Sequence, residues 1–154
     1  MPIWRLAGSS LLLTVSKVFN AGGEMRICRT RYRIKPVEVE DFSILGGCTL
    51  VHQFCKVGAH CFTAMNSVIS KDVLPFTMIS GHMAKPHGLN TEGLKRRGFS
   101  SESINALRKA YRIIYRSNFT LEQAIGKLEP MANEYDEIGQ LLTFLKNVTR
   151  GIVR

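Results

Sequence analysis

The sequence predicts a chain of mixed β and α structure, in which coils of a parallel β-helix are followed by a C-terminal α-helical domain. Two observations predict this fold. A period of six residues occupies much of residues 37–85. Beyond it, capping residues and apolar residues at helical spacing replace that period. Residues 1–36 show neither pattern, so we expect three segments, 1–36, 37–85 and 86–154.

The period of six has two marked positions. Aliphatic or similar residues recur at Val39, Leu45, Val51, Val57, Thr63 and Ile69. Small or β-branched residues stand four places later, at Ser43, Thr49, Cys55, Cys61, Ser67 and Val73. A helix repeats near 3.6 residues and a plain strand near two, so this period indicates the hexapeptide repeat of a parallel β-helix. Three hexads form one triangular coil, so Val39 should stack on Val57; short strands that alternate by chance are the alternative.

Helix signals fill the C-terminal segment. Four helices are expected. The first is 92–97, capped by Asn90 or Thr91 and stopped by Gly98, and the second runs from Ser100 or Ser101 to about Arg116. The third begins with the capping box Thr120–Gln123, runs through Leu128 and is interrupted by Pro130, and the fourth is capped by Asp136 and ended by Gly151. A helical segment of this size holds little core alone, so we expect it to dock on the β-helix or on a neighbouring subunit.

The net charge of +9 is concentrated at the N-terminal end, where residues 1–36 hold seven of the 21 bases and one acid. A nucleic acid, an acidic carrier protein or a nucleotide diphosphate would each suit a basic chain, and charge alone does not choose among them. A nucleic-acid binder led by residues 24–35 is the weakest of these, because no aromatic residue beyond Tyr32 is interleaved with its bases. We therefore expect no nucleic-acid partner.

The four cysteines form no C-x-x-C pair and no Cys/His ligand spacing, so no metal is expected. Cys55 and Cys61 occupy small-residue positions of the repeat, which favours buried, reduced thiols and hence a cytoplasmic protein. No apolar run reaches the roughly 18 residues of a membrane span, so no transmembrane segment is expected. Residues 6–15 are a weak signal-peptide core interrupted by a glycine and two serines, and secretion is the alternative.

Six stretches of the sequence resemble, in order and spacing, the family of acyl-[acyl-carrier-protein]–UDP-N-acetylglucosamine O-acyltransferases that begin lipid A biosynthesis. They are VEVEDFSILGG, VHQFCKVGAH, KDVLPF, KPHGLNTEGLKRRGFS, AYRIIYRS and TRGIVR, within residues 37–154. The resemblance implies a homotrimer of left-handed parallel β-helices, each with a C-terminal helical domain. It also implies transfer of an (R)-3-hydroxyacyl chain from acyl carrier protein to the 3-hydroxyl of UDP-N-acetylglucosamine, in the groove between subunits and without a cofactor.

The resemblance implies roles for six substrate-binding residues: His52, Gln53, Asn90, Glu92, Arg96 and Arg97. The first two would line the groove and contact the acylated sugar, and the next two would contact the nucleotide. The two arginines would meet the UDP phosphates and the acidic carrier, which suits guanidinium geometry. The alternatives are a hydrogen-bonded structural histidine and a solvated run of charge.

Met65 lies where the family uses side-chain bulk to limit the length of the acyl chain. A methionine at a position where other members have glycine implies a shorter acyl chain. Simple packing of Met65 in the β-helix core is the alternative.

The family's general base does not have a counterpart here. It is a histidine one to two coils before His52, and none of the four histidines precedes His52. The family spacing leads to Lys17, and Pro36 stands where another groove histidine is usual. We therefore expect a truncated or frameshifted C-terminal half that is inactive alone. The alternatives are a non-catalytic fragment that binds acyl carrier protein or the UDP-sugar, a sibling N-acyltransferase and a metal-bearing hydratase.

Overall fold

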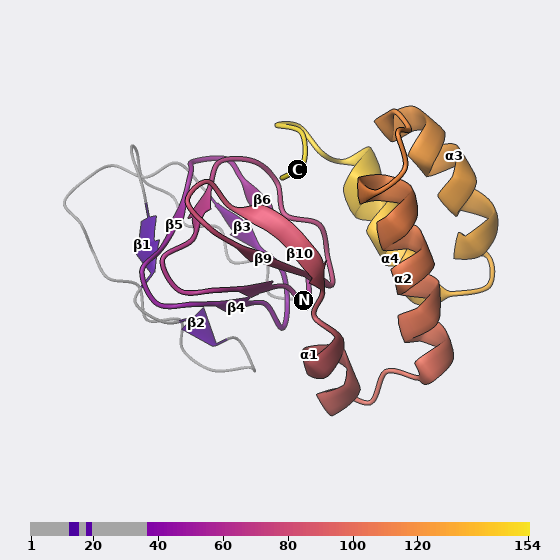
Figure 1. Cartoon of the computed structure of the whole chain (residues 1–154), viewed down its shortest axis with the longest axis horizontal. Coiled ribbons are helices and arrows are strands. Elements are labelled where there is room, and N and C mark those ends of the chain that lie inside the picture. Colours follow the sequence, from indigo (N-terminus) through magenta and orange to yellow (C-terminus); the bar gives the residue numbers. More distant parts are fainter. Residues whose placement is uncertain (1–12, 16–17, 20–36) are drawn as a thin grey trace.

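The structure is a computed structural model that describes residues 13–15, 18–19 and 37–154 (Figure 1). Its strands are β1 (Leu13–Val15), β2 (Val18–Phe19), β3 (Glu38–Val39), β4 (Ile44–Leu45), β5 (Thr49–Val51), β6 (Lys56–Val57), β7 (Phe62–Thr63), β8 (Val68–Ile69), β9 (Thr77–Ser80) and β10 (Lys85–Leu89). Its helices are α1 (Thr91–Arg96), α2 (Ser101–Tyr115), α3 (Leu121–Ala132) and α4 (Asp136–Lys146). The rest of the first 36 residues, Lys17 and Pro36 included, lies outside the described residues.

Strands that are separated by three hexads pair in parallel. Strand β3 pairs with β6, β4 with β7 and β5 with β8, and Val39 is the partner of Val57, as the hexad period predicts. The chain thus visits three sheets in turn and then returns to the first. We call these the first sheet (β3, β6), the second sheet (β4, β7, β9) and the third sheet (β5, β8).

Both marked positions of the hexad point into the interior. The buried residues of the two sets are Leu45, Val51, Val57, Thr63, Ile69, Ser43, Thr49, Cys55, Cys61, Ser67 and Val73, each at most 1% exposed. Their polar atoms are paired inside: Ser43 Oγ donates to the Gly58 carbonyl at 2.7 Å, and the Cys61 thiol donates to the Leu74 carbonyl at 2.9 Å. Burial raises the pKa of the Cys55 thiol to about 11 and of the Cys61 thiol to about 12, so both stay neutral thiols.

Antiparallel strands cover both edges of this parallel region. Strand β1 pairs with β5, and β2 pairs with β4, on the side that precedes the first hexads. On the other side β10 pairs with β9 and leads the chain into α1. Strand β10 begins at Lys85, so it crosses the expected start of the helical segment, and the four helices follow it.

The cap residues of the first three helices follow the prediction. Asn90 caps α1, Ser100 caps α2, and Thr120 forms the predicted capping box with Gln123 at the start of α3. Gly98 follows α1 with a φ of 81°, a left-handed conformation that favours glycine and stops the helix.

Three details of the helix prediction are wrong. Helix α3 continues through Pro130 to Ala132, because the proline removes only its own intrahelical hydrogen bond and Met131 and Ala132 pack against the buried core of the helices. Asp136 is the first residue of α4 and not its cap; Tyr135 has the cap position and makes no side-chain cap bond. Helix α4 ends at Lys146, so Gly151 does not end it.

The helices share one apolar core, which reaches back to the β region. Figure 1 shows α2, α3 and α4 lying side by side next to the sheets. Their buried side chains form one cluster with Leu74 and Phe76 of the last hexads and with Ile152 of the C-terminal tail. This confirms that the helical segment docks on the β region of its own chain. No helix among the described residues is long and apolar enough to cross a membrane.

Candidate functional site

The six residues expected to bind substrate lie in two places: two are at a turn between sheets, and four are on or beside α1, which contacts another such turn. His52 and Gln53 follow β5, at the turn from the third sheet to the first. Asn90 and Arg97 contact His60, which follows β6 at the turn from the first sheet to the second. We call these the third-to-first turn and the first-to-second turn.

At the third-to-first turn, two side chains contact the carbonyl oxygen of Gln53. His52 Nδ1 lies 3.0 Å from the Gln53 carbonyl oxygen. The same oxygen accepts a hydrogen bond from Arg150 Nη1 at 3.2 Å. The backbone N–H of His52 donates to the Ile69 carbonyl at 2.8 Å, which fixes the main chain of His52 on the third sheet. His52 and Gln53 are both half-buried, so their side chains remain accessible.

Asn90 joins α1 to the first-to-second turn through both ends of its amide. Its Oδ1 accepts from the Gly93 N–H at 3.2 Å, and its Nδ2 donates to the His60 carbonyl at 3.0 Å. A Cβ at Gly93 would lie 2.4 Å from Asn90 Nδ2, so this close approach needs glycine. The amide of Asn90 is therefore a structural link in this chain, and a nucleotide contact would have to share it.

Arg97 is held against a stack of aromatic rings. Its guanidinium lies 5.0 Å from the centroid of the Phe42 ring, and its Nη1 lies 3.5 Å from His60 Nδ1. His60 stacks between Phe42 and Phe76, with ring centroids 5.0 and 5.5 Å away, and Phe99 meets it edge-on. Burial, with Arg97 as a second cause, lowers the pKa of His60 to about 4. Burial also lowers the pKa of Arg97.

Glu92 and Arg96 lie on the exposed side of α1. Glu92 pairs with Lys95 at 3.3 Å, with side chains that are 74% and 58% exposed. Such a pair contributes little to stability, so nothing in the fold requires it. Arg96 is exposed, and Arg97 beside it is half-buried. The exposed guanidinium of Arg96 thus neighbours that of Arg97, which contacts Phe42 and His60.

Met65 is 80% exposed, and this contradicts the alternative that it simply packs in the core. It lies on the turn from the second sheet to the third, where the next residue, Asn66, donates its backbone N–H to the Gly47 carbonyl. That turn differs from the two that carry the other candidate residues. Within one chain, therefore, the candidate residues lie at two turns and along α1, which contacts a third turn.

Sequence reasoning missed three residues that shape these turns. Phe42 and His60 are separated by three hexads, so the hexad register could have placed them at the same turn. Arg150 had no such signal, because it reaches Gln53 from 97 residues away. Among the described residues, no three or more His, Cys, Asp or Glu side chains are grouped closely enough to hold a metal ion.

Comparison with known proteins gives a consistent result. The family model described as UDP N-acetylglucosamine O-acyltransferase, domain 2, matches residues 72–153. The acyl-[acyl-carrier-protein]–UDP-N-acetylglucosamine O-acyltransferase of Thiobacillus denitrificans is 58% identical over 117 residues, which are 76% of this chain and 45% of that protein. The protein of the same name from Alkalilimnicola ehrlichii is 48% identical over 118 residues, 77% of this chain and 46% of that protein.

Solved structures agree with these relatives. The UDP-N-acetylglucosamine acyltransferase of Francisella novicida has a TM-score of 0.74 at 36% identity, over 77% of this chain and 44% of that one. The enzyme of the same name from Bacteroides fragilis has a TM-score of 0.74 at 36% identity, over 77% of this chain and 46% of that one. The chain spans slightly less than half the length of the curated relatives that it matches. On this evidence, the chain belongs to the UDP-N-acetylglucosamine O-acyltransferase family.

Proposed function

We propose that this chain forms the C-terminal half of the site that transfers an (R)-3-hydroxyacyl chain from acyl carrier protein to the 3-hydroxyl of UDP-N-acetylglucosamine, the first step of lipid A biosynthesis. The observation that carries this proposal is the fixed guanidinium of Arg97 next to the exposed one of Arg96. Two guanidinium groups in this arrangement suit a diphosphate, because each presents parallel N–H donors to phosphate oxygens.

We further propose that residues 37–85 are coils of a left-handed parallel β-helix, that residues 86–154 form the helical domain, and that three chains associate. The parallel pairing of strands separated by three hexads supports the β-helix. Two exposed methionines support the association: Met65 and Met83 are 80% and 51% exposed. Large apolar side chains left on a surface favour contact with another protein surface.

A trimer would also account for the scattered candidate residues. His52 and Gln53 lie at a different turn from Asn90 and Arg97, so one chain does not surround a ligand with all of them. In the proposed assembly, the third-to-first turn of one chain faces the first-to-second turn of its neighbour. Arg96, Arg97 and Glu92 would then bind UDP and the carrier, while His52 and Gln53 would contact the acylated sugar.

We expect this chain to bind its substrates without turning them over. No histidine precedes His52 in the chain, so we expect no general base at the family position and no turnover by this chain alone. Lys17 would be a poor base, because an ordinary lysine is protonated near neutral pH. Binding of the UDP-sugar and of the acidic carrier is the function that remains. Buried neutral thiols at Cys55 and Cys61 support a place in the reducing cytoplasm.

Calorimetric titration of UDP-N-acetylglucosamine into the chain tests the proposal, with Arg97→Gln as the variant and Lys109→Gln as its matched control. Lys109 is an exposed base on α2 outside the candidate residues. Loss of a charge-assisted hydrogen bond costs about 1.5–3 kcal/mol, so Arg97→Gln should weaken binding roughly ten- to hundredfold. Lys109→Gln should bind as the unaltered chain does.

Sedimentation and an acyl-transfer assay complete the test. We expect a trimer that binds UDP-N-acetylglucosamine without acylating it when the 3-hydroxyacyl carrier is added. Equal affinity of Arg97→Gln and the unaltered chain would contradict the binding role. Robust turnover by the chain alone would instead contradict our expectation that the chain lacks a general base.

A further inference from the structure

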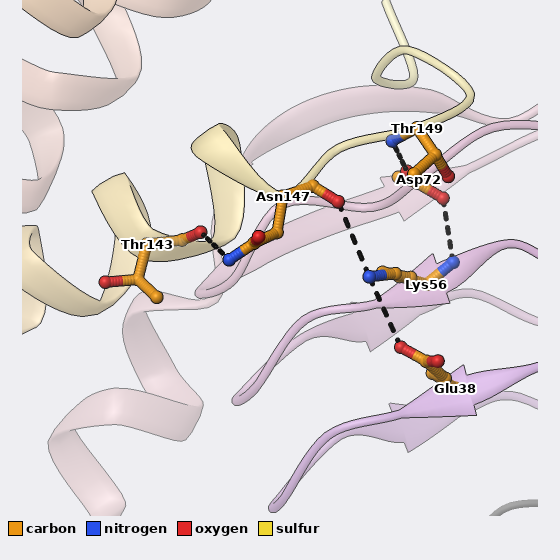
Figure 2. Close-up of polar contacts among 6 residues, drawn as sticks. All are labelled: Glu38, Lys56, Asp72, Thr143, Asn147 and Thr149. Carbon is orange, nitrogen blue, oxygen red and sulfur yellow. Dashed lines mark hydrogen bonds and ion pairs between the residues drawn. The ribbon is translucent and has the colours of Figure 1, made fainter.

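The C-terminal tail is bonded to the β region by one buried residue, Asp72, through its carboxylate and its backbone. Asp72 is fully buried, and Figure 2 shows its two oxygens accepting hydrogen bonds from different segments. One oxygen accepts from the Lys56 N–H at 2.8 Å, and the other accepts from the Thr149 N–H at 3.3 Å. The Asp72 N–H donates to the Gly151 carbonyl at 3.0 Å, and the Val153 N–H donates to the Asp72 carbonyl at 2.9 Å.

These bonds fix the backbone on both sides of Arg150. Thr149 precedes it and Gly151 follows it, and both are bonded to Asp72. Gly151 has a φ of 72°, so the tail turns sharply there in a conformation that suits glycine. The guanidinium of Arg150 therefore starts from a fixed position, although Arg150 itself is exposed. Its Nη1 donates a hydrogen bond to the Gln53 carbonyl oxygen at 3.2 Å.

Lys56, a base of the first sheet near this tail, makes other contacts. Its Nζ lies 3.4 Å from a carboxylate oxygen of Glu38 and 3.4 Å from the Asn147 carbonyl (Figure 2). Arg150 is thus the base that bonds to the Gln53 carbonyl. This carbonyl belongs to the residue directly after His52, so its direction decides what the His52 ring can contact.

The contact between His52 and this carbonyl selects one form of the imidazole ring. A carbonyl oxygen only accepts hydrogen bonds, so a hydrogen bond at 3.0 Å requires a proton on His52 Nδ1. In the neutral ring, Nε2 then carries the lone pair and is a hydrogen-bond acceptor. A carbonyl oxygen has two lone pairs, which lets Arg150 and His52 bond to it together.

We propose that Arg150 is a positioning residue for His52: held by Asp72, it fixes the Gln53 carbonyl, which keeps His52 in the Nδ1–H tautomer and presents Nε2 as an acceptor for a ligand hydroxyl. The ligand part of this inference rests on the proposed function, in which His52 contacts the acylated sugar. The tautomer part concerns the ligand-free chain. The tail thereby links the end of α4 to the third-to-first turn.

Nitrogen NMR of the ligand-free chain with ¹⁵N-labelled histidine tests this proposal. The two ring nitrogens of a neutral histidine differ widely in chemical shift according to which one carries the proton. Comparison with a His52→Gln spectrum assigns the signals of His52. We expect the Nδ1–H tautomer in the unaltered chain, a shift toward the Nε2–H tautomer in Arg150→Met, and partial recovery in Arg150→Lys.

Arg154→Met is the matched control, because it removes the same charge from the same tail at an exposed residue that follows the bonded segment. It should leave the His52 tautomer unchanged. An unaltered chain in the Nε2–H form, an Arg150→Met chain with an unchanged tautomer, or equal shifts in both variants would each overturn the proposal. None of these outcomes depends on whether UDP-N-acetylglucosamine binds.

Asp72→Asn tests the fastening separately. The amide keeps the shape of the carboxylate, but one of its two ends can no longer accept a hydrogen bond. We expect faster hydrogen exchange at the Thr149 or Lys56 amide, whichever faces the new NH₂ end, together with the tautomer shift seen in Arg150→Met. Faster exchange with an unchanged tautomer, or slow exchange with a shifted one, would refute the role of Asp72 in positioning Arg150.

Discussion

The neutral ring of His60 accepts a hydrogen bond from the guanidinium of Arg97, with 3.5 Å between Nδ1 and Nη1. The pKa of His60 is lowered to about 4, so the ring is neutral near pH 7. The stack of Phe42, His60 and Phe76 excludes water from the faces of the His60 ring. A protonated His60 would repel Arg97 and could not accept a hydrogen bond from it. The first-to-second turn therefore keeps its arginine fixed only while His60 is uncharged.

The first prediction concerns the pH dependence of this pair. The pKa of His60 is lower in the folded chain, at about 4, than its unfolded value of about 6.5. Between these two values the unfolded chain binds more protons, so His60 stabilises the fold fully above about pH 6.5 and loses that contribution as the pH falls toward 4. NMR titration should give a His60 pKa of about 4.

Two variants separate the causes of this shift. Arg97→Gln should raise the pKa of His60 toward its ordinary value, because the positive charge next to the ring is removed while burial remains. His60→Gln should flatten the acid side of the stability curve measured by urea unfolding. A His60 that titrates near 6.5 in the unaltered chain would show that the ring is not held as described.

The second prediction concerns close packing between stacked hexads that are far apart in the sequence. A Cβ at Gly58 would lie 2.4 Å from the backbone nitrogen of Pro75, so Gly58→Ala forces the backbone apart. We expect a loss of about 1–3 kcal/mol in the free energy of unfolding, or more, as for other overpacked cores. Urea denaturation measures this loss as a lower midpoint.

Gly126→Ala is the matched control for Gly58→Ala. Gly126 lies within α3, and a Cβ there meets no atom within 4 Å. Alanine favours the helix over glycine, so this variant should gain roughly 0.5–1 kcal/mol. Equal effects of the two substitutions would contradict the packing described at Gly58.

The third prediction concerns the capping box of α3. Thr120 Oγ1 accepts from the Gln123 N–H at 3.3 Å, and Gln123 Oε1 accepts from the Thr120 N–H at 3.0 Å. Thr120→Ala removes the threonine half of the box and should cost about 1 kcal/mol. Thr143→Ala is the control, because the Thr143 hydroxyl donates back to the Gly139 carbonyl within α4 and its loss should be nearly neutral. A cost at Thr143 as large as at Thr120 would rule out the cap as the cause.

The fourth prediction concerns Met65 and acyl length. It needs an active enzyme, which we would obtain by joining residues 37–154 to the preceding part of the Thiobacillus denitrificans relative. Met65→Gly removes an exposed bulky side chain, so we expect the preferred acyl chain to lengthen by about two or more carbons, since each buried CH₂ contributes about 0.8 kcal/mol. Mass spectrometry of the products measures the length. Exposed Met78→Gly is the control, and an equal change there would argue against a specific role for Met65.

Local repetition in the sequence was enough to predict much of the fold. The hexad period placed Leu45, Val51 and Ser43 in the interior, because a repeat of three hexads fixes both the inward direction and the partner in the next coil. It was equally possible to predict the caps at Ser100 and Thr120, since a cap depends on residues within one helical turn. The same local reasoning failed at Pro130, where the packing of α3 holds the helix together beyond the proline.

The way in which the candidate residues are held followed from tertiary contacts alone. Asn90 was expected to contact a nucleotide, but its amide is bonded to His60 and Gly93. Arg150 and Asp72 stood in recognised stretches but without an assigned contact, because the partners that join the tail to the β region lie 97 and 77 residues away along the chain. Contacts of this kind depend on where the helical segment docks and where the tail returns. A repeat carries no information on that docking, which is set by the shared core around Leu74 and Ile152.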